Sequence, residues 1–149
     1  MIITHQRVRI CDDCQNGDLA DLKILIAKGI DVNAYCPMYN LLPIFYSGWL
    51  CRDHLVETLI NAGAIIDKEG SHGTALRGAL ENAGTYSGNP DIVSRCGKTI
   101  VQLMKFGASL DTALKCETSR CQSKKKDVDI GMQLGVIKAA IAEGKKYEK

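Results

Sequence analysis

The chain has 149 residues, a formal net charge of +2 and seven cysteines, and only 5% of its residues are aromatic. This length suits one domain, 1–149, and the shortage of aromatic residues favours helical packing over a β-sandwich. A charge so close to balance gives no electrostatic argument for binding nucleic acid or a membrane. No run of about eighteen apolar residues occurs, so no transmembrane helix is expected.

Three similar segments dominate the sequence. Each has the apolar end of a helix, then a glycine (Gly29, Gly63 or Gly107), then a short polar turn, and together they cover residues 25–33, 59–67 and 103–111. The glycines are 34 and then 44 residues apart. A helix that ends in the left-handed region needs glycine there, and helix pairs of this size bury their apolar faces only against neighbouring copies. The segments therefore predict stacked helix pairs.

The first two predicted units, about 5–35 and 36–69, fit this interpretation most simply. In the first, residues 14–19 resemble a tight turn between two helices, and Leu22, Leu25 and Ile26 follow at helical spacing. In the second, Pro43 suits the first turn of a helix, where its missing N–H costs nothing. The apolar positions of its second helix are Leu55, Val56, Leu59 and Ile60.

The third unit, 70–111, has a longer spacing. Residues 84–91 are rich in turn-forming types. We therefore expect them to form an insertion between two helices, a loop that projects from the surface and does not extend either helix. Asp91 is the expected cap of a lengthened second helix.

A fourth unit is expected over 112–142, with a charged tail at 143–149. Residues 119–126 are polar and basic and predict a turn. One amphipathic capping helix should follow, with an apolar stripe of Ile130, Leu134, Ile137, Ala140 and Ile141. Terminal units of such proteins are atypical because one face meets water.

The chain resembles the ankyrin-repeat family. The 34-residue spacing is close to the family period of ~33, and residues 42–45 (Leu-Pro-Ile-Phe) stand where the family has Thr-Pro-Leu-His. Cys11, Phe45 and Arg77 replace the family histidine. The resemblance implies an all-α solenoid of about four helix pairs with short hairpin fingers and a C-terminal capping helix.

The resemblance also implies a concave protein-binding face. Its expected contact residues lie on the first finger, on the end of the next helix and on the equivalent positions of the third unit: Tyr35, Met38, Tyr39, Leu41, Trp49, Leu50, Ser71, Glu81 and Asn82. Large aromatic residues and methionine concentrate binding energy at interfaces. The alternative interpretation is that Trp49 packs as a local lid.

Candidate sites for chemistry are weak. The N-terminal segment lacks the pattern of a secretory signal, so we interpret the cysteines as reduced thiols in a cytoplasmic protein. Cys11 and Cys14, with Cys116 and Cys121, could form a zinc site, but packing as small apolar residues fits better. We therefore expect no metal, no cofactor and no enzyme activity.

The expected function is that of a monomeric module that occludes or tethers a protein partner, as an inhibitor, immunity protein or effector does. Two alternatives stay open. One is a thiol- or zinc-dependent activity at Cys11 and Cys14, and the other is a scaffold that self-associates through its aromatic patch.

Overall fold

The computed structural model describes residues 2–148 and the side chains of residues 5–148. This part of the chain contains ten helices and no strand, which confirms the all-α prediction. The helices are α1 (Ile2–Asn16), α2 (Leu19–Ala27), α3 (Pro43–Trp49), α4 (Asp53–Asn61), α5 (Ala75–Thr85), α6 (Pro90–Lys105), α7 (Leu110–Leu114), α8 (Ser119–Ser123), α9 (Lys125–Gln133) and α10 (Gly135–Lys145).

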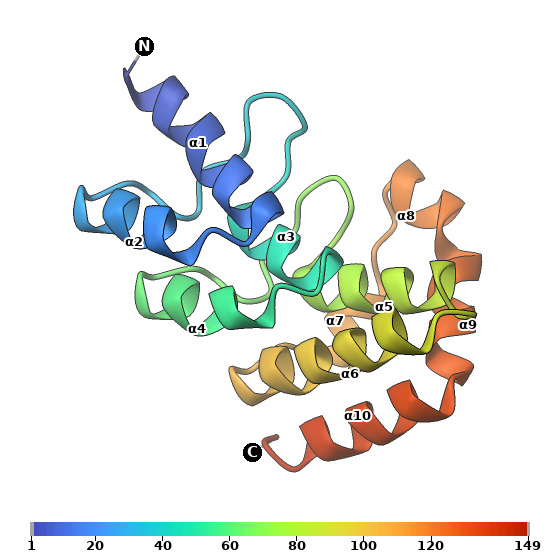
Figure 1. Cartoon of the computed structure of the whole chain (residues 1–149). Coiled ribbons are helices and arrows are strands. Elements are labelled where there is room, and N and C mark those ends of the chain that lie inside the picture. The colour runs from blue at the N-terminus through green and yellow to red at the C-terminus, as the bar shows by residue number, and fades with distance from the viewer. Residues whose placement is uncertain (1, 149) are drawn as a thin grey trace.

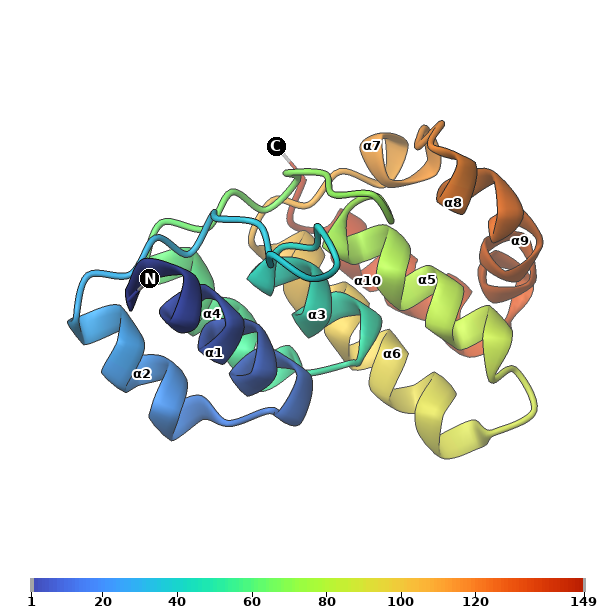
Figure 2. The same ribbon diagram turned by 90° about the horizontal axis from the view of Figure 1, so that it is seen from above.

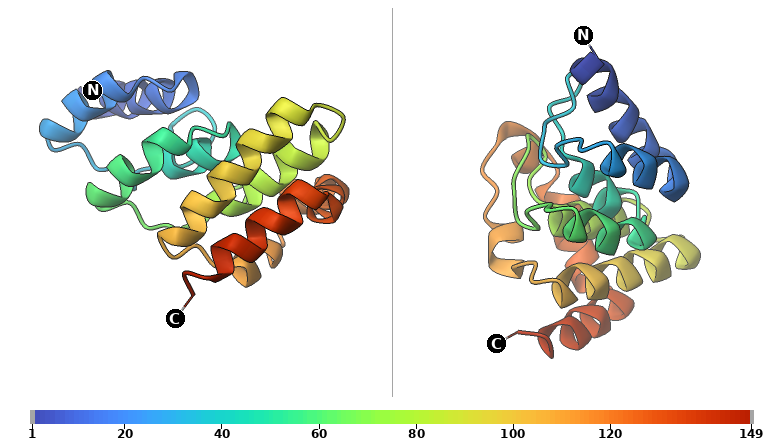
Figure 3. Two further views of the ribbon diagram at one scale, coloured as in Figure 1. Left: turned by 60° about the horizontal axis from the view of Figure 1, so that its bottom comes forward. Right: turned by 90° about the vertical axis from the view of Figure 1, so that its left-hand side faces the viewer.

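Helices α1 and α2, α3 and α4, and α5 and α6 form antiparallel pairs that pack on one another (Figure 1), whereas α7 and α8 are short and stand outside these pairs. Helix α3 packs between α1 and α5, whereas α4 contacts α2 and α6. At the C-terminal side α9 packs on α5 and α10 on α6 (Figure 3). One continuous apolar core runs through these contacts, from Ile10 in α1 to Ile141 in α10.

The predicted glycine turns are confirmed. Gly29, Gly63 and Gly107 all have positive φ, from 84° to 101°. At the end of α4 the amide of Gly63 donates to the carbonyl of Ile60 at 3.0 Å, and the amide of Ala64 donates to Leu59 at 2.9 Å. This pair of bonds satisfies the last helical carbonyls, and it requires the left-handed residue between them.

The predicted excursion at 84–91 is wrong in part. Gly84 is buried inside α5, and only residues 86–89 connect α5 to α6. A Cβ at Gly84 would collide with the carbonyl oxygen of Asp127, so a side chain is excluded where α5 crosses α9. The second helix is lengthened as expected, but Asn89 caps it: its side chain accepts from the amides of Asp91 and Ile92.

The predicted single capping helix is also wrong, because Leu134 has an extended backbone (ψ 134°) and separates α9 from α10. The two helices cover different partners, α5 and α6, which are antiparallel. The chain must therefore reverse between them. Ile130 and Leu134 are only half-buried as a result. The predicted turn at 119–126 is wrong as well, because residues 119–123 form the short helix α8 and α9 begins at Lys125.

None of the helices within residues 2–148 combines the length and apolar character that crossing a membrane would require.

Candidate functional site

The long connections α2–α3 and α4–α5 lie along the same side of the molecule (Figure 2). The hydroxyl of Tyr35 donates to the carbonyl of Glu69 at 3.0 Å. The amine of Lys68 donates to the carbonyl of Asn33 at 2.9 Å and lies 4.9 Å from the centroid of the Tyr35 ring. The two connections are thus fixed to each other, and the first can present its tip as a defined surface.

A side chain that follows one glycine turn binds the backbone of the next turn at two places along the chain. The side chain of Asn33 donates to the carbonyl of Gly63 and accepts from the amide of Ile65, each within 2.9 Å. Asp67, 34 residues later, accepts from the amide of Ser109 at 3.1 Å. Each side chain links its own turn to the next one, so the spacing between successive turns is set by hydrogen bonds as well as by helix packing.

A hollow of about 210 Å³ opens beneath the first connection. We call it the Trp49 hollow, and its lining residues are Gln15, Tyr39, Leu41, Tyr46, Trp49 and His72. The Trp49 ring lies 5.6 Å from Phe45 and 5.8 Å from His72, measured between centroids. At the rim, Tyr39 is 55% exposed and the neighbouring Met38 is 65% exposed. The hollow therefore joins an exposed apolar rim to an aromatic floor.

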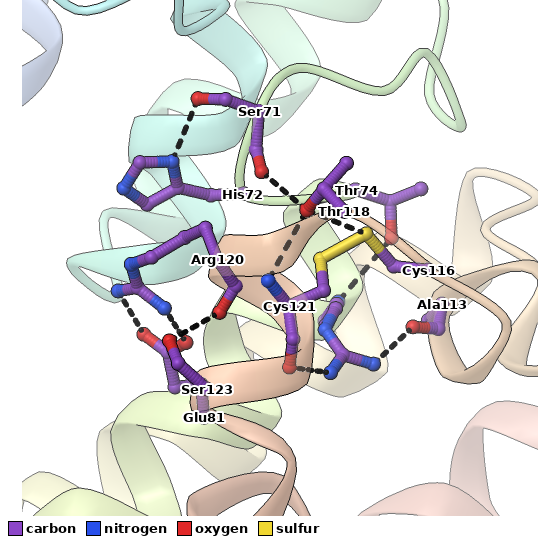
Figure 4. Close-up of a disulfide and its surroundings, with 11 residues drawn as sticks. Ser71, His72, Thr74, Glu81, Ala113, Cys116, Thr118, Arg120, Cys121 and Ser123 are labelled. Atoms are coloured by element: carbon purple, nitrogen blue, oxygen red, sulfur yellow. Dashed lines mark hydrogen bonds and ion pairs between the residues drawn. A yellow bond between two sulfur atoms is a disulfide. The ribbon is translucent and has the colours of Figure 1, made fainter.

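An ion pair lies on the other side of Trp49. Its indole nitrogen donates to Oε2 of Glu81 at 3.0 Å. Both oxygens of Glu81 also accept from the guanidinium of Arg120, at 2.7 and 3.0 Å (Figure 4). A second hollow of about 180 Å³ adjoins them and is lined by Trp49, Leu50, Glu81, Asn82, Thr85, Tyr86, Arg120 and Lys124. Trp49 is the residue shared by the two hollows.

The residues predicted to form the binding face fall into three groups by exposure. Tyr35, Met38 and Tyr39 are exposed, Trp49, Leu50, Ser71 and Asn82 are half-buried, and Leu41 and Glu81 are buried. Trp49, an expected contact residue, is half-buried and not fully exposed, because its ring packs on Phe45 and its nitrogen is bound to Glu81. Leu41 contributes to the floor of the Trp49 hollow, and Glu81 holds its neighbours in place.

A disulfide joins Cys116 to Cys121, so the prediction that all seven cysteines are reduced is wrong. The other five are free and buried. Near the disulfide, Arg77 of α5 donates to the carbonyls of Ala113 and Cys121. Thr118 donates to the carbonyl of Ser71 at 2.7 Å. These bonds fix the α7–α8 segment against α5 and thereby place Arg120 over Glu81.

Sequence reasoning missed His72 and Arg120, both of which line this surface. Each comes from a connection or helix whose position depends on contacts distant in the chain. Nothing in the sequence around Arg120 indicates that it pairs with Glu81, which is 39 residues away.

The Cys11 and Cys14 side chains are in the core, 3% and 0% exposed, as packing residues are expected to be. Burial raises the pKa of both thiols, which keeps them protonated and unreactive at neutral pH. Among the side chains described, no group of three or more His, Cys, Asp or Glu residues is placed to hold a metal ion.

Comparison of the chain with protein-family models and with curated proteins gave no match. A functional interpretation therefore depends on the fold and on the geometry of this surface.

Proposed function

We propose that the chain is a divergent ankyrin-repeat protein. Four helix pairs support this: α1–α2, α3–α4, α5–α6 and α9–α10. Three glycine turns of one geometry and the two side-chain links from Asn33 and Asp67 recur with the spacing of a repeat. The fourth pair departs from the others, because α7 and α8 precede it and pack beside α5 in place of a finger.

We further propose that the chain binds another protein through the surface around Trp49 and does no chemistry itself. The observation that carries this proposal is the exposed pair Met38 and Tyr39 above the Trp49 hollow. Adjacent exposed apolar side chains that continue into an apolar hollow are typical of interaction sites. The hollow is large enough for one apolar side chain of a partner, and the half-buried Trp49 forms its wall.

The basic groups around the surface favour a partner segment that also carries carboxylates. Arg120 and Lys124 line the second hollow, and Lys68 lies beside Tyr35. The carboxylate of Glu81 is already bound by Arg120 and Trp49. We expect the partner to place an apolar side chain in the Trp49 hollow. Its acidic groups should lie near the amines of Lys68 and Lys124, because Arg120 is already paired with Glu81. The role as inhibitor, immunity protein or effector, and the cytoplasmic location, stay predictions.

Site-specific photocrosslinking tests the proposal. A benzoylphenylalanine at position 39 should form a crosslink to one partner in cells of the source organism. The same group at position 24, where Ile24 is also exposed (49%) but lies on α2 away from the hollow, should not crosslink to that partner. Equal crosslinking from both positions would reject this surface as the interface. A crosslink to a second copy of the chain would favour the self-associating scaffold instead.

A further inference from the structure

The sulfur atoms of Cys51 and Cys96 lie 2.8 Å apart, although the residues are 45 positions apart in the chain. Cys51 is in the turn between α3 and α4, and Cys96 is in the middle of α6. The side-chain amide of Asn82 in α5 donates to both sulfurs, at 3.5 and 3.6 Å. Three elements therefore converge on one pair of free thiols.

The backbone conformation of Cys51 indicates that its side chain has a functional role. Cys51 has a φ of 55°, in the left-handed region. Gly17 occupies the equivalent position 34 residues earlier, with a φ of 72°. A residue with a Cβ is sterically disfavoured in this conformation, whereas glycine is not. Cys51 therefore occupies a backbone conformation that glycine adopts more easily. Residues in such unfavourable conformations concentrate at functional sites.

Access to the pair comes from a surface hollow of about 250 Å³, lined by Leu50, Cys51, Arg52, Asn82, Tyr86, Ile92 and Arg95. Hydrogen bonding to Cys96 lowers the pKa of Cys51 against the opposing effect of burial, and hydrogen bonding to Asn82 and Thr99 adds to the lowering. The same hydrogen bond, together with burial, raises the pKa of Cys96. Cys51, which is 3% exposed but lines this hollow, is therefore the more acidic thiol of the pair, which is the arrangement of an attacking and a resolving cysteine.

We propose that Cys51 and Cys96 are a modification site, a dithiol that a peroxide oxidises to an intramolecular disulfide between the α3–α4 turn and α6. The thiolate of Cys51 attacks one peroxide oxygen, and the O–O bond breaks to give a sulfenic acid and hydroxide. Cys96 then attacks the Cys51 sulfur, the S–S bond forms and the S–O bond breaks. The two thiol protons end in two water molecules, so two thiols and one hydrogen peroxide give one disulfide and two waters. This inference does not depend on the proposed binding function.

Thiol counting on the folded chain tests the proposal. After treatment with hydrogen peroxide, the protein is denatured without reductant and alkylated. We expect the number of alkylated cysteines to fall from five to three and a peptide map to link Cys51 to Cys96. The Cys96→Ser variant should instead retain a sulfenic acid at Cys51, which dimedone traps. A Cys14→Ala control, which removes a buried thiol of α1 that is not part of the pair, should form the same link as the wild type.

The Cys51→Gly variant removes the thiol without disturbing the fold, because glycine suits the left-handed backbone at this position. It should fold, keep all four of its remaining free thiols after the same treatment and form no link. The proposal would be overturned if the wild type kept five alkylated cysteines, or if the link joined another pair such as Cys11 and Cys36.

Discussion

The indole nitrogen of Trp49 donates a hydrogen bond of 3.0 Å to the carboxylate of Glu81. This contact ties the end of α3 to the middle of α5, and Arg120 from α8 binds the same carboxylate. Glu81 is 5% exposed. A carboxylate this buried is stable only when its partners are in place, so the three residues should hold the binding surface as one unit.

The Glu81→Ala substitution should lower the free energy of unfolding by about 2 kcal/mol, because it leaves the Trp49 and Arg120 donors without their acceptor. Glu81→Gln keeps an oxygen for one donor and should cost less. Urea midpoints of the purified proteins measure both. The exposed Glu57 on α4 provides the control, since Glu57→Ala should change stability by less than about 0.5 kcal/mol. Equal midpoints for Glu81→Ala and Glu57→Ala would show that the network contributes nothing.

Gly84→Ala should destabilise the protein by about 1–3 kcal/mol, because the added Cβ collides with the carbonyl oxygen of Asp127 and forces α9 away from α5. Gly88→Ala, in the α5–α6 connection, is the matched control, since a Cβ there meets nothing within 4 Å. Thermal unfolding of the two variants makes the comparison. If both variants have the same unfolding temperature as the wild type, α9 is not in close contact with α5.

Gly63→Val should cost more than about 1 kcal/mol, although a Cβ at this position meets nothing within 4 Å. The cost arises from the backbone alone, because the φ of 101° is unfavourable for a branched residue. Gly135→Ala, at the first residue of α10 where space is also open, should leave stability unchanged or raise it. A urea midpoint for Gly63→Val equal to that of the wild type would refute the helix end described at this position.

The pH dependence of stability should depend on Asp13, which is buried in α1 and whose Oδ2 has no hydrogen-bond partner among the described residues. Burial, followed by the neighbouring carboxylate of Asp21, raises the pKa of Asp13 to about 7. The folded-state pKa thus exceeds the unfolded value of about 3.9, so this contribution to stability is full below about pH 4 and is lost as pH rises through about 7.

We predict that the urea midpoint of the wild type falls relative to Asp13→Asn between about pH 5 and pH 8. The difference between the two proteins isolates Asp13 from the three histidines, which titrate in both. Midpoint curves that run parallel over this range would mean that Asp13 ionises normally in the folded protein.

The parts of this structure that could be predicted from the sequence are local. A glycine after an apolar helix end specifies its own left-handed turn, so Gly29, Gly63 and Gly107 were located without reference to distant residues. The helical position of Gly84 depends on the approach of α9, which begins 41 residues later. The break at Leu134 depends on which helices α9 and α10 cover.

In the candidate site, too, local features could be predicted and contacts between distant residues could not. Met38 and Tyr39, on the α2–α3 connection, could be placed on the surface from the resemblance alone. The partners of Trp49 could not, because Glu81 and Arg120 meet through a segment that is fixed by Arg77. Cys51 and Cys96 are 45 residues apart and come together only in the folded chain, so no local spacing marks them as a pair.

Trp49→Ala is a poor probe of binding, because the ring packs on Phe45 and His72 and its loss should destabilise the fold. Tyr39→Ala is the sharper variant, since the side chain is 55% exposed. Its urea midpoint should match that of the wild type, which separates binding from stability.

Quantitative capture from cells of the source organism tests the central claim most directly. Wild type, Tyr39→Ala and the control Ile24→Ala are immobilised, and the recovered partner is then titrated against each protein. We predict one partner that binds the wild type and Ile24→Ala equally and Tyr39→Ala about thirtyfold more weakly, the loss expected for an aromatic anchor worth about 2 kcal/mol. A partner that binds all three with the same affinity would contradict the claim that the surface around Trp49 is the interface.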